Sequence, residues 1–256
     1  MMSVYLVTQA TGQQSQWVIN HLLEAGHQIH AVVRNIEKIP AMLSDQNITL
    51  FQGESKNFDD IHKAAQGCQG AFLNTVSFPG LEVLQAKTIV EACEKAGVKN
   101  LIAATSICAY NNFPRLPSDG EIDDLLTGGA KFPYSDAHDV GIYAAAALQD
   151  PVKFRGQEID LGNELFDFEQ IRDILVKVSC REVRVVKRTP EDVEKLGIAV
   201  HGHMFQHFAN MKPFGFIEGG AEEVQKKFGI PFTPLEDALQ RDRVRLMECI
   251  PAKEEV

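Results

Sequence analysis

The segment V-Y-L-V-T-Q-A-T-G-Q-Q-S, residues 4–15, decides the fold expected for this chain. Its first four residues are aliphatic or aromatic, which is typical of a buried strand, and a turn containing glycine follows them. Residues 14–26 then place Val18, Leu22 and Ala25 at helical spacing, and Gly26 follows as a stop signal. A strand, a glycine-containing turn and a helix therefore open the chain.

The same alternation continues to residue 104. Further strand-like runs occupy residues 29–33, 48–51, 70–73 and 100–104, and helical stretches lie between them at 36–43, 58–66 and 81–96. Strands that alternate with helices of this length imply right-handed crossovers and a parallel sheet covered on both faces. The sequence predicts an α/β fold with a doubly wound, Rossmann-like parallel sheet, whose ligands bind at the carboxyl ends of the strands.

The second half of the chain has a different character. Residues 111–133 are rich in Pro, Gly and Asp, and only 121–126 resemble a short helix. An Ala-rich helix is expected at 135–148, with Ser135 or Asp136 as its cap, and Thr189-Pro190 is a strong helix start. Strands are expected at 158–161 and 183–186 around a helix at 168–178. We predict a dinucleotide-binding domain at 1–165, with a shortened, loop-rich segment at 111–133, and a smaller α-rich region at 166–256.

The composition limits the function. The chain has 256 residues, is 45% hydrophobic and carries a net charge of −10, which argues against direct nucleic-acid binding. Five widely spaced cysteines without a C-x-x-C pair are expected to be reduced thiols. No apolar run is long enough for a bilayer, and the first residues do not resemble a leader peptide. We expect no membrane association and a cytoplasmic protein, or a nuclear one if it is a regulator.

No metal site is predicted. His201, His203 and His207 are the best candidates, but on a helix only His203 and His207 share a face. No cysteine or acidic ligand lies close by in sequence, so a cluster at a helix start is the favoured interpretation.

The turn after the first strand resembles a phosphate-binding loop that has lost two glycines. Such loops direct backbone N–H groups toward a pyrophosphate and normally use three glycines, of which only Gly12 remains here. Gln9 stands at the first position, where a positive φ would cost on the order of 1 kcal/mol. Ser15 stands at the third, where a glycine would allow close packing of helix on sheet. Both replacements are expected to weaken cofactor affinity.

Arg34 follows the second strand, where an acidic residue would bind a ribose 2′-hydroxyl and a cation would accept a 2′-phosphate. Together with Lys38, Arg34 favours NADP(H) over NAD(H). The alternative is an arginine at a strand end that only contacts solvent.

The chain resembles the NmrA-like family, an atypical branch of the short-chain dehydrogenase/reductase superfamily. The resemblance covers nearly the whole chain and rests on the loop V-T-Q-A-T-G-Q-Q-S-Q-W-V, on L-L-E-A-G-H-Q-I-H-A-V-V-R-N, on A-A-Q-G-C-Q-G-A-F-L-N-T, on P-Y-S-D-A-H-D-V-G-I-Y and on T-P-E-D-V-E-K-L-G.

The resemblance implies a set of cofactor-binding residues. It places the phosphates against Thr8, Ala10, Thr11, Gly12, Gln13 and Gln14. It places the 2′-phosphate against Arg34 and Lys38, the adenine near Glu54, and the adenosine-side ribose beside Asn74 and Thr75. Ser106, just past the fifth strand, joins this site, where it is positioned to bond a substrate carbonyl or to cap the loop.

The catalytic residues stay unassigned. Reductases of the superfamily use a tyrosine whose pKa is lowered by a lysine four residues later, and no Tyr-x-x-x-Lys occurs here. Cys108 and Tyr110 are alternative proton donors or packing residues.

Two functions remain, an NADPH-dependent oxidoreductase acting on a small organic metabolite and a non-catalytic NADP(H) redox sensor that binds a regulatory protein partner. The family includes both, and its base rate favours the oxidoreductase. Substrate, partner and oligomeric state are not determined by the sequence.

Overall fold

The computed structural model describes residues 2–76, 78, 80–105, 120–196, 200–211, 214 and 220–250. They form two compact units. The first comprises residues 1–109 and 137–158, and the second comprises residues 110–136 and 159–256.

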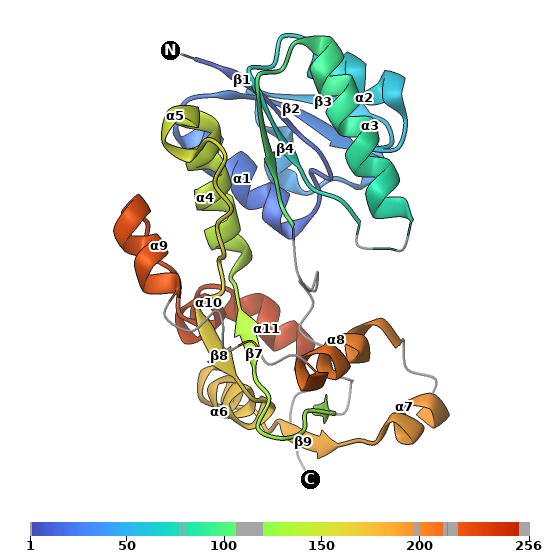
Figure 1. The fold of residues 1–256 in the computed structure, drawn as a ribbon, viewed down its shortest axis with the longest axis vertical. Helices are drawn as coiled ribbons and strands as arrows, with labels where there is room; N and C mark the ends of the chain where they lie inside the picture. The colour runs from blue at the N-terminus through green and yellow to red at the C-terminus, as the bar shows by residue number, and fades with distance from the viewer. Residues whose placement is uncertain are drawn as a thin grey trace. The chain divides into compact units, whose positions relative to one another are not determined.

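A parallel sheet forms the centre of the first unit (Figure 1). Its strands are β1 (Val4–Val7), β2 (Gln28–Val33), β3 (Ile48–Gln52), β4 (Gly70–Leu73) and β5 (Asn100–Ala103). They lie in the order β3-β2-β1-β4-β5, and every neighbouring pair is parallel. The chain reverses its direction of winding between β1 and β4, so the predicted doubly wound sheet is confirmed, and its ligand-binding edge lies at the carboxyl ends of these strands.

Helices cover both faces of this sheet. One face packs on α1 (Gln13–Glu24) and α4 (Ala137–Gln149), through a core that includes Val18, Leu22 and Leu148. The other face packs on α2 (Phe58–Ala65) and α3 (Leu81–Ala96), through a core that includes Ile61 and Ile89. The short helix α5 (Pro151–Phe154) follows α4. Each of these four helices thus packs buried apolar residues on the sheet.

The helix expected at 36–43 is replaced by two short 3-10 helices, η1 (Ile36–Lys38) and η2 (Ala41–Ser44). Pro40 stands between them with an extended backbone, at φ −60° and ψ 147°. Proline lacks the N–H that a continuous helix needs, and it restricts the residue before it to extended conformations. The helical segment is therefore interrupted.

The second unit combines two small sheets with helices. Strand β6 (Glu121–Asp124) pairs in parallel with β9 (Arg184–Lys187), and β7 (Phe132–Tyr134) pairs antiparallel with β8 (Glu164–Phe166). The helices are α6 (Phe168–Ser179), α7 (Pro190–Leu196), α8 (Val200–Met211), α9 (Gly220–Phe228), α10 (Leu235–Arg241) and α11 (Arg243–Cys249). The helix start predicted at Thr189-Pro190 is confirmed, and the Thr189 hydroxyl accepts from the Asp192 N–H at 3.2 Å.

The prediction of a short helix at 121–126 is wrong, because Glu121–Asp124 form strand β6. Basic residues of β9 and the loop after it neutralise its acidic side chains. Asp123 accepts from Arg188 at 2.9 Å, and the buried Asp124 lies 2.6 Å from Lys187 Nζ. These partners lie more than 60 residues away in sequence, so a local pattern could not reveal them. The same contacts show that Asp123 and Asp124 are both buried and ion-paired.

The strand predicted at 158–161 is also wrong, because these residues have no regular structure and the strand forms at Glu164–Phe166. The Leu161 carbonyl accepts instead from the Ser135 hydroxyl, at 2.7 Å. This side-chain bond uses a backbone group that a sheet ladder would need.

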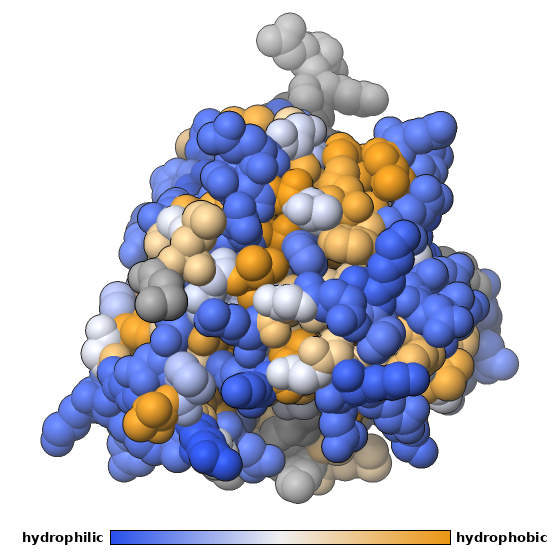
Figure 2. Space-filling model, turned by 90° about the horizontal axis from the view of Figure 1, so that it is seen from above, coloured by the Kyte–Doolittle hydropathy of each residue, from blue (hydrophilic) through white to orange (hydrophobic). Residues whose placement is uncertain are grey.

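Figure 2 shows a face on which hydrophilic residues surround a smaller area of hydrophobic ones. Helix α3 carries exposed apolar side chains, among them Val83, Leu84 and Val90. Among the described residues, no helix combines the length and apolar character needed to cross a bilayer.

Candidate functional site

The loop between β1 and α1 is held by the ends of both neighbouring strands. The Thr8 N–H donates to the Phe72 carbonyl of β4 at 3.2 Å, and the Ala10 N–H donates to the Val32 carbonyl of β2 at 3.2 Å. The Gly12 N–H then donates to the Gln9 carbonyl at 2.7 Å and closes a tight turn. The loop therefore turns at the carboxyl edge of the sheet, at the point where the winding reverses.

Gly12 is the N-cap of α1 and provides no side chain to cap the helix. Its φ of −74° and ψ of 151° are open to any residue, so the backbone conformation does not demand glycine. A Cβ at this position would lie 3.1 Å from the Gln9 carbonyl oxygen, a tight contact that a small local shift would relieve. The first turn of α1 also contains no acidic residue. A helix start of this kind suits an anion, which the helix dipole attracts.

Gln9 adopts the left-handed conformation, with φ at 51°. Its side-chain amide donates to the hydroxyl of Ser55, a buried residue beyond the end of β3, at 3.4 Å. Its side chain thus interacts with the β3 side of the sheet and does not cap α1.

Ser15 is fully buried on the inner side of the first turn of α1. Its hydroxyl donates to the Thr8 carbonyl at 2.9 Å and accepts from the Asn74 side-chain amide at 3.2 Å. The serine that replaces a packing glycine thus turns toward the protein interior and joins the helix to the strand ends.

Thr8 and Asn74 join β1 to β4 at the point where the winding reverses. The Asn74 N–H donates to Thr8 Oγ1 at 2.9 Å, and this hydroxyl lies 3.1 Å from the carbonyl oxygens of Phe72 and Asn74. Thr75 follows and is half-buried. The structure therefore brings Thr8, the loop and Asn74 together at one edge of the sheet.

Arg34 and Lys38 lie beyond the end of β2, and both are exposed. Arg34 is the first residue after the strand, and Lys38 ends η1, which begins where the Asn35 side chain accepts from the Glu37 N–H at 2.8 Å. Within the described part of the chain, no carboxylate forms an ion pair with either cation. Both are available to an anionic group.

Glu54 lies beyond the end of β3 and is exposed, with an ion pair to Lys56 at 2.9 Å. Its N–H donates to the Asp60 carboxylate at 3.0 Å. A Cβ at the preceding Gly53 would lie 2.6 Å from Asp60 Cβ, so only glycine fits there. This contact with Asp60 was not predicted from the sequence, although the glycine directly after a strand was a usable signal.

Tyr143 of α4 is not a substitute for the missing Tyr-x-x-x-Lys pair. Burial, with a smaller contribution from Asp139, raises the pKa of Tyr143 to about 12. A catalytic phenol needs the opposite shift. Ser106, Cys108 and Tyr110 lie outside the described residues.

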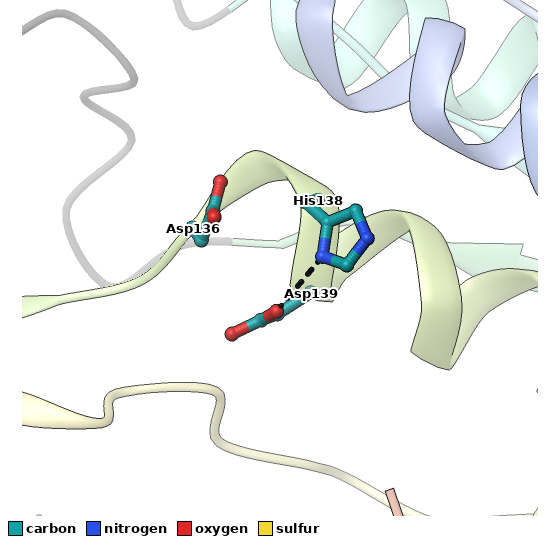
Figure 3. A group of neighbouring side chains, drawn as sticks. All are labelled: Asp136, His138 and Asp139. Carbon is teal, nitrogen blue, oxygen red and sulfur yellow. Dashed lines mark hydrogen bonds and ion pairs between the residues drawn. The ribbon is translucent and has the colours of Figure 1, made fainter. Parts of the chain in front are cut away.

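Figure 3 shows Asp136, His138 and Asp139, three residues of types that bind metals. The carboxylate of Asp136 accepts two hydrogen bonds from Arg241, at 2.7 and 3.2 Å, and His138 Nδ1 lies 3.2 Å from Asp139. Because these groups are already paired within the chain, we assign no metal to them. Of the histidines considered above, the side chains of His201 and His203 lie outside the described part of the structure.

The sheet is doubly wound, and α1 begins at Gly12, without a side-chain cap, at the point where the winding reverses. These two features are typical of the dinucleotide-binding class of α/β proteins. Residues 10–140, about half of the chain, match the NAD(P)H-binding family, and the chain belongs to that family.

Curated relatives match less than half of the chain. Dihydroflavonol 4-reductase of Solanum lycopersicum is 33% identical over 119 residues, which cover 39% of this chain and 31% of the relative. Quinone oxidoreductase 2 of Escherichia coli is 34% identical over 119 residues, which cover 46% of this chain and 41% of the relative. The nitrogen metabolite repression protein nmrA of Emericella nidulans is 32% identical over 117 residues, which cover 43% of this chain and 33% of the relative. The matches thus span about a third of the length of these relatives.

Solved structures extend the likeness of the fold to the whole chain. NmrA, a negative transcriptional regulator crystallised with NADP, has a TM-score of 0.73 at 20% identity and covers 96% of this chain and 97% of its own. An NADPH-dependent quinone oxidoreductase from Escherichia coli, crystallised with NADPH, has a TM-score of 0.68 at 21% identity. The match covers 93% of this chain and 99% of that structure's chain. The predicted resemblance to NmrA-like proteins is confirmed at the level of the fold.

Proposed function

We propose that the chain binds NADP(H) at the carboxyl edge of its five-stranded sheet and acts as an NADPH-dependent oxidoreductase on a small organic metabolite. The observation that carries the nucleotide site is the start of α1, where Gly12 provides no cap and the side chains of Gln9 and Ser15 bond elsewhere. The diphosphate would lie against Thr8, Ala10, Thr11, Gly12, Gln13 and Gln14. When bound, the cofactor would supply the hydride, and these residues would orient it.

The preference for NADP(H) rests on Arg34 and Lys38. Both are exposed cations beyond β2, the strand whose end binds the adenosine ribose in folds of this class. Two cations near a 2′-phosphate would gain charge-assisted hydrogen bonds that NAD(H) cannot offer. Glu54 would lie near the adenine, and Asn74 and Thr75 beside the adenosine-side ribose. Ser106 stays a proposal on sequence grounds.

The oxidoreductase assignment is supported by two relatives, one named as a reductase and one as an oxidoreductase, which are 33 and 34% identical to the matched part of this chain. A second function is a redox sensor that binds NADP(H) without turnover and recognises a regulatory protein partner. It is supported by the missing Tyr-x-x-x-Lys pair, by the raised pKa of Tyr143 and by the likeness to a transcriptional regulator.

Titration of the purified chain with NADPH and NADH, followed by nucleotide fluorescence, tests the site. We expect NADPH to bind more tightly, and Arg34→Ala to weaken NADPH about tenfold or more while changing NADH little. Arg155→Ala, at an exposed arginine after α5, is the matched control and should change neither affinity. An equal loss of both nucleotides in Arg34→Ala would refute the assignment of the 2′-phosphate.

Turnover separates the two functions. Steady consumption of NADPH above the uncatalysed rate, with a panel of quinones and small carbonyl compounds, is expected of the oxidoreductase. Tight binding of NADPH without consumption across the panel would favour the sensor.

A further inference from the structure

Ser15 occupies the position at which a three-glycine loop carries its packing glycine, yet its side chain is fully buried and makes two hydrogen bonds. The acceptor of one bond is the carbonyl of Thr8, the first residue of the same loop. The donor of the other is the side chain of Asn74, which follows β4. The Ser15 hydroxyl therefore connects three segments around the loop: the end of β1, the first turn of α1 and the end of β4.

We propose that the Ser15 hydroxyl is a positioning residue for the cofactor diphosphate, an inference that rests on the proposed function. A loop with three glycines sets the distance between helix and strand by direct backbone packing. In this chain the bond from Ser15 to Thr8 joins the first turn of α1 to the first residue of the loop. The bond from Asn74 fixes the hydroxyl itself, so the first turn of α1 keeps one orientation relative to the ends of the strands.

This arrangement has a specific consequence for ligands. The first turn of α1 faces the diphosphate, which NADPH and NADH share, whereas Arg34 and Lys38 face the 2′-phosphate. Loss of the Ser15 hydroxyl should therefore weaken both dinucleotides by the same factor, about five- to tenfold for a lost buried hydrogen bond. It should leave unchanged a ligand that carries the 2′-phosphate but no diphosphate.

The test compares Ser15→Ala with the wild type, using NADPH and NADH by fluorescence and 2′-AMP by ligand-observed NMR. Ser44→Ala, at an exposed serine in η2, is the matched control and should change no affinity. Equal loss of NADPH and NADH with unchanged 2′-AMP binding is the expected result. Ser15→Cys keeps a side chain of similar size with a weaker donor, and it repeats the test if the alanine variant does not fold.

Two results would overturn the inference. Unchanged dinucleotide affinity in Ser15→Ala would show that the hydroxyl does not position the loop. An equal loss of all three ligands would show a general structural role. If the wild type itself binds neither dinucleotide, the proposed function fails first, so the two failures are distinguishable.

Discussion

Gly141 of α4 lies directly against the backbone of Trp17 of α1. A Cβ at position 141 would lie 2.4 Å from Trp17 Cβ and 2.8 Å from its carbonyl carbon. Neither contact can be relieved by rotating a side chain, because both atoms belong to or adjoin the main chain of α1. The closest approach of the two helices on this face of the sheet thus depends on one glycine, three residues after His138.

Gly141→Ala should therefore separate α1 from α4 and destabilise the chain. We expect a loss of about 1–3 kcal/mol or more in the free energy of unfolding, typical of overpacking a buried contact. Urea denaturation followed by circular dichroism measures it. Gly220→Ala is the control, since a Cβ at Gly220 meets nothing within 4 Å and that variant should unfold like the wild type.

Gly12→Ala should affect binding more than stability. The backbone at Gly12 is open to alanine, so we expect the free energy of unfolding to change by about 1 kcal/mol or less. The new methyl group would stand at the start of α1 against the Gln9 carbonyl, and NADPH and NADH affinities should both fall about tenfold or more. Fluorescence titration beside a thermal melt separates the two effects. Unchanged affinity in a folded variant would contradict the assignment of the diphosphate to this turn.

Gln9→Gly should stabilise the loop relative to Gln9→Ala. Both variants remove the bond to Ser55, but only glycine relieves the cost of a left-handed conformation at φ 51°. That cost is on the order of 1 kcal/mol, partly offset by the greater flexibility of glycine in the unfolded chain. The measurement is the urea midpoint of each variant. A glycine variant less stable than the alanine variant would show that position 9 carries no such strain.

Stability should fall as the pH drops through the histidine range because of His21. The rings of Trp17, His21 and His138 contact one another between α1 and α4, with 5.1 Å between the two imidazole centroids. Burial, and then repulsion by His138, lower the pKa of His21, while Glu24 opposes the shift. Among the described residues, His21 Nε2 is buried without a hydrogen-bond partner.

The sign of the effect follows from proton binding. Near pH 6.5 the unfolded chain takes up a proton that folded His21 resists, so the contribution of neutral His21 is present above that pH and is lost below it. His21→Phe keeps a ring in the contact but cannot titrate. We expect its melting temperature to fall less than that of the wild type between pH 7.5 and 5.5. Parallel curves for the two proteins would exclude His21 as the origin of the pH dependence.

The sequence alone determined the features that depend on neighbouring residues. Alternating strand and helix patterns predicted the parallel sheet, and the single Gly12 marked the turn between the first strand and the first helix. These conformations are set within a few residues, by backbone sterics, turn chemistry and the spacing of apolar side chains.

Tertiary structure decided what depends on partners far away in the chain. Glu121–Asp124 became a strand because cations more than 60 residues later neutralise it. The Ser15 hydroxyl turns inward because it accepts a hydrogen bond from the side chain of Asn74, 59 residues away, and donates one to the Thr8 carbonyl. Hydrogen bonds and ion pairs act over a few ångströms in space, and only the folded chain brings these groups within that distance.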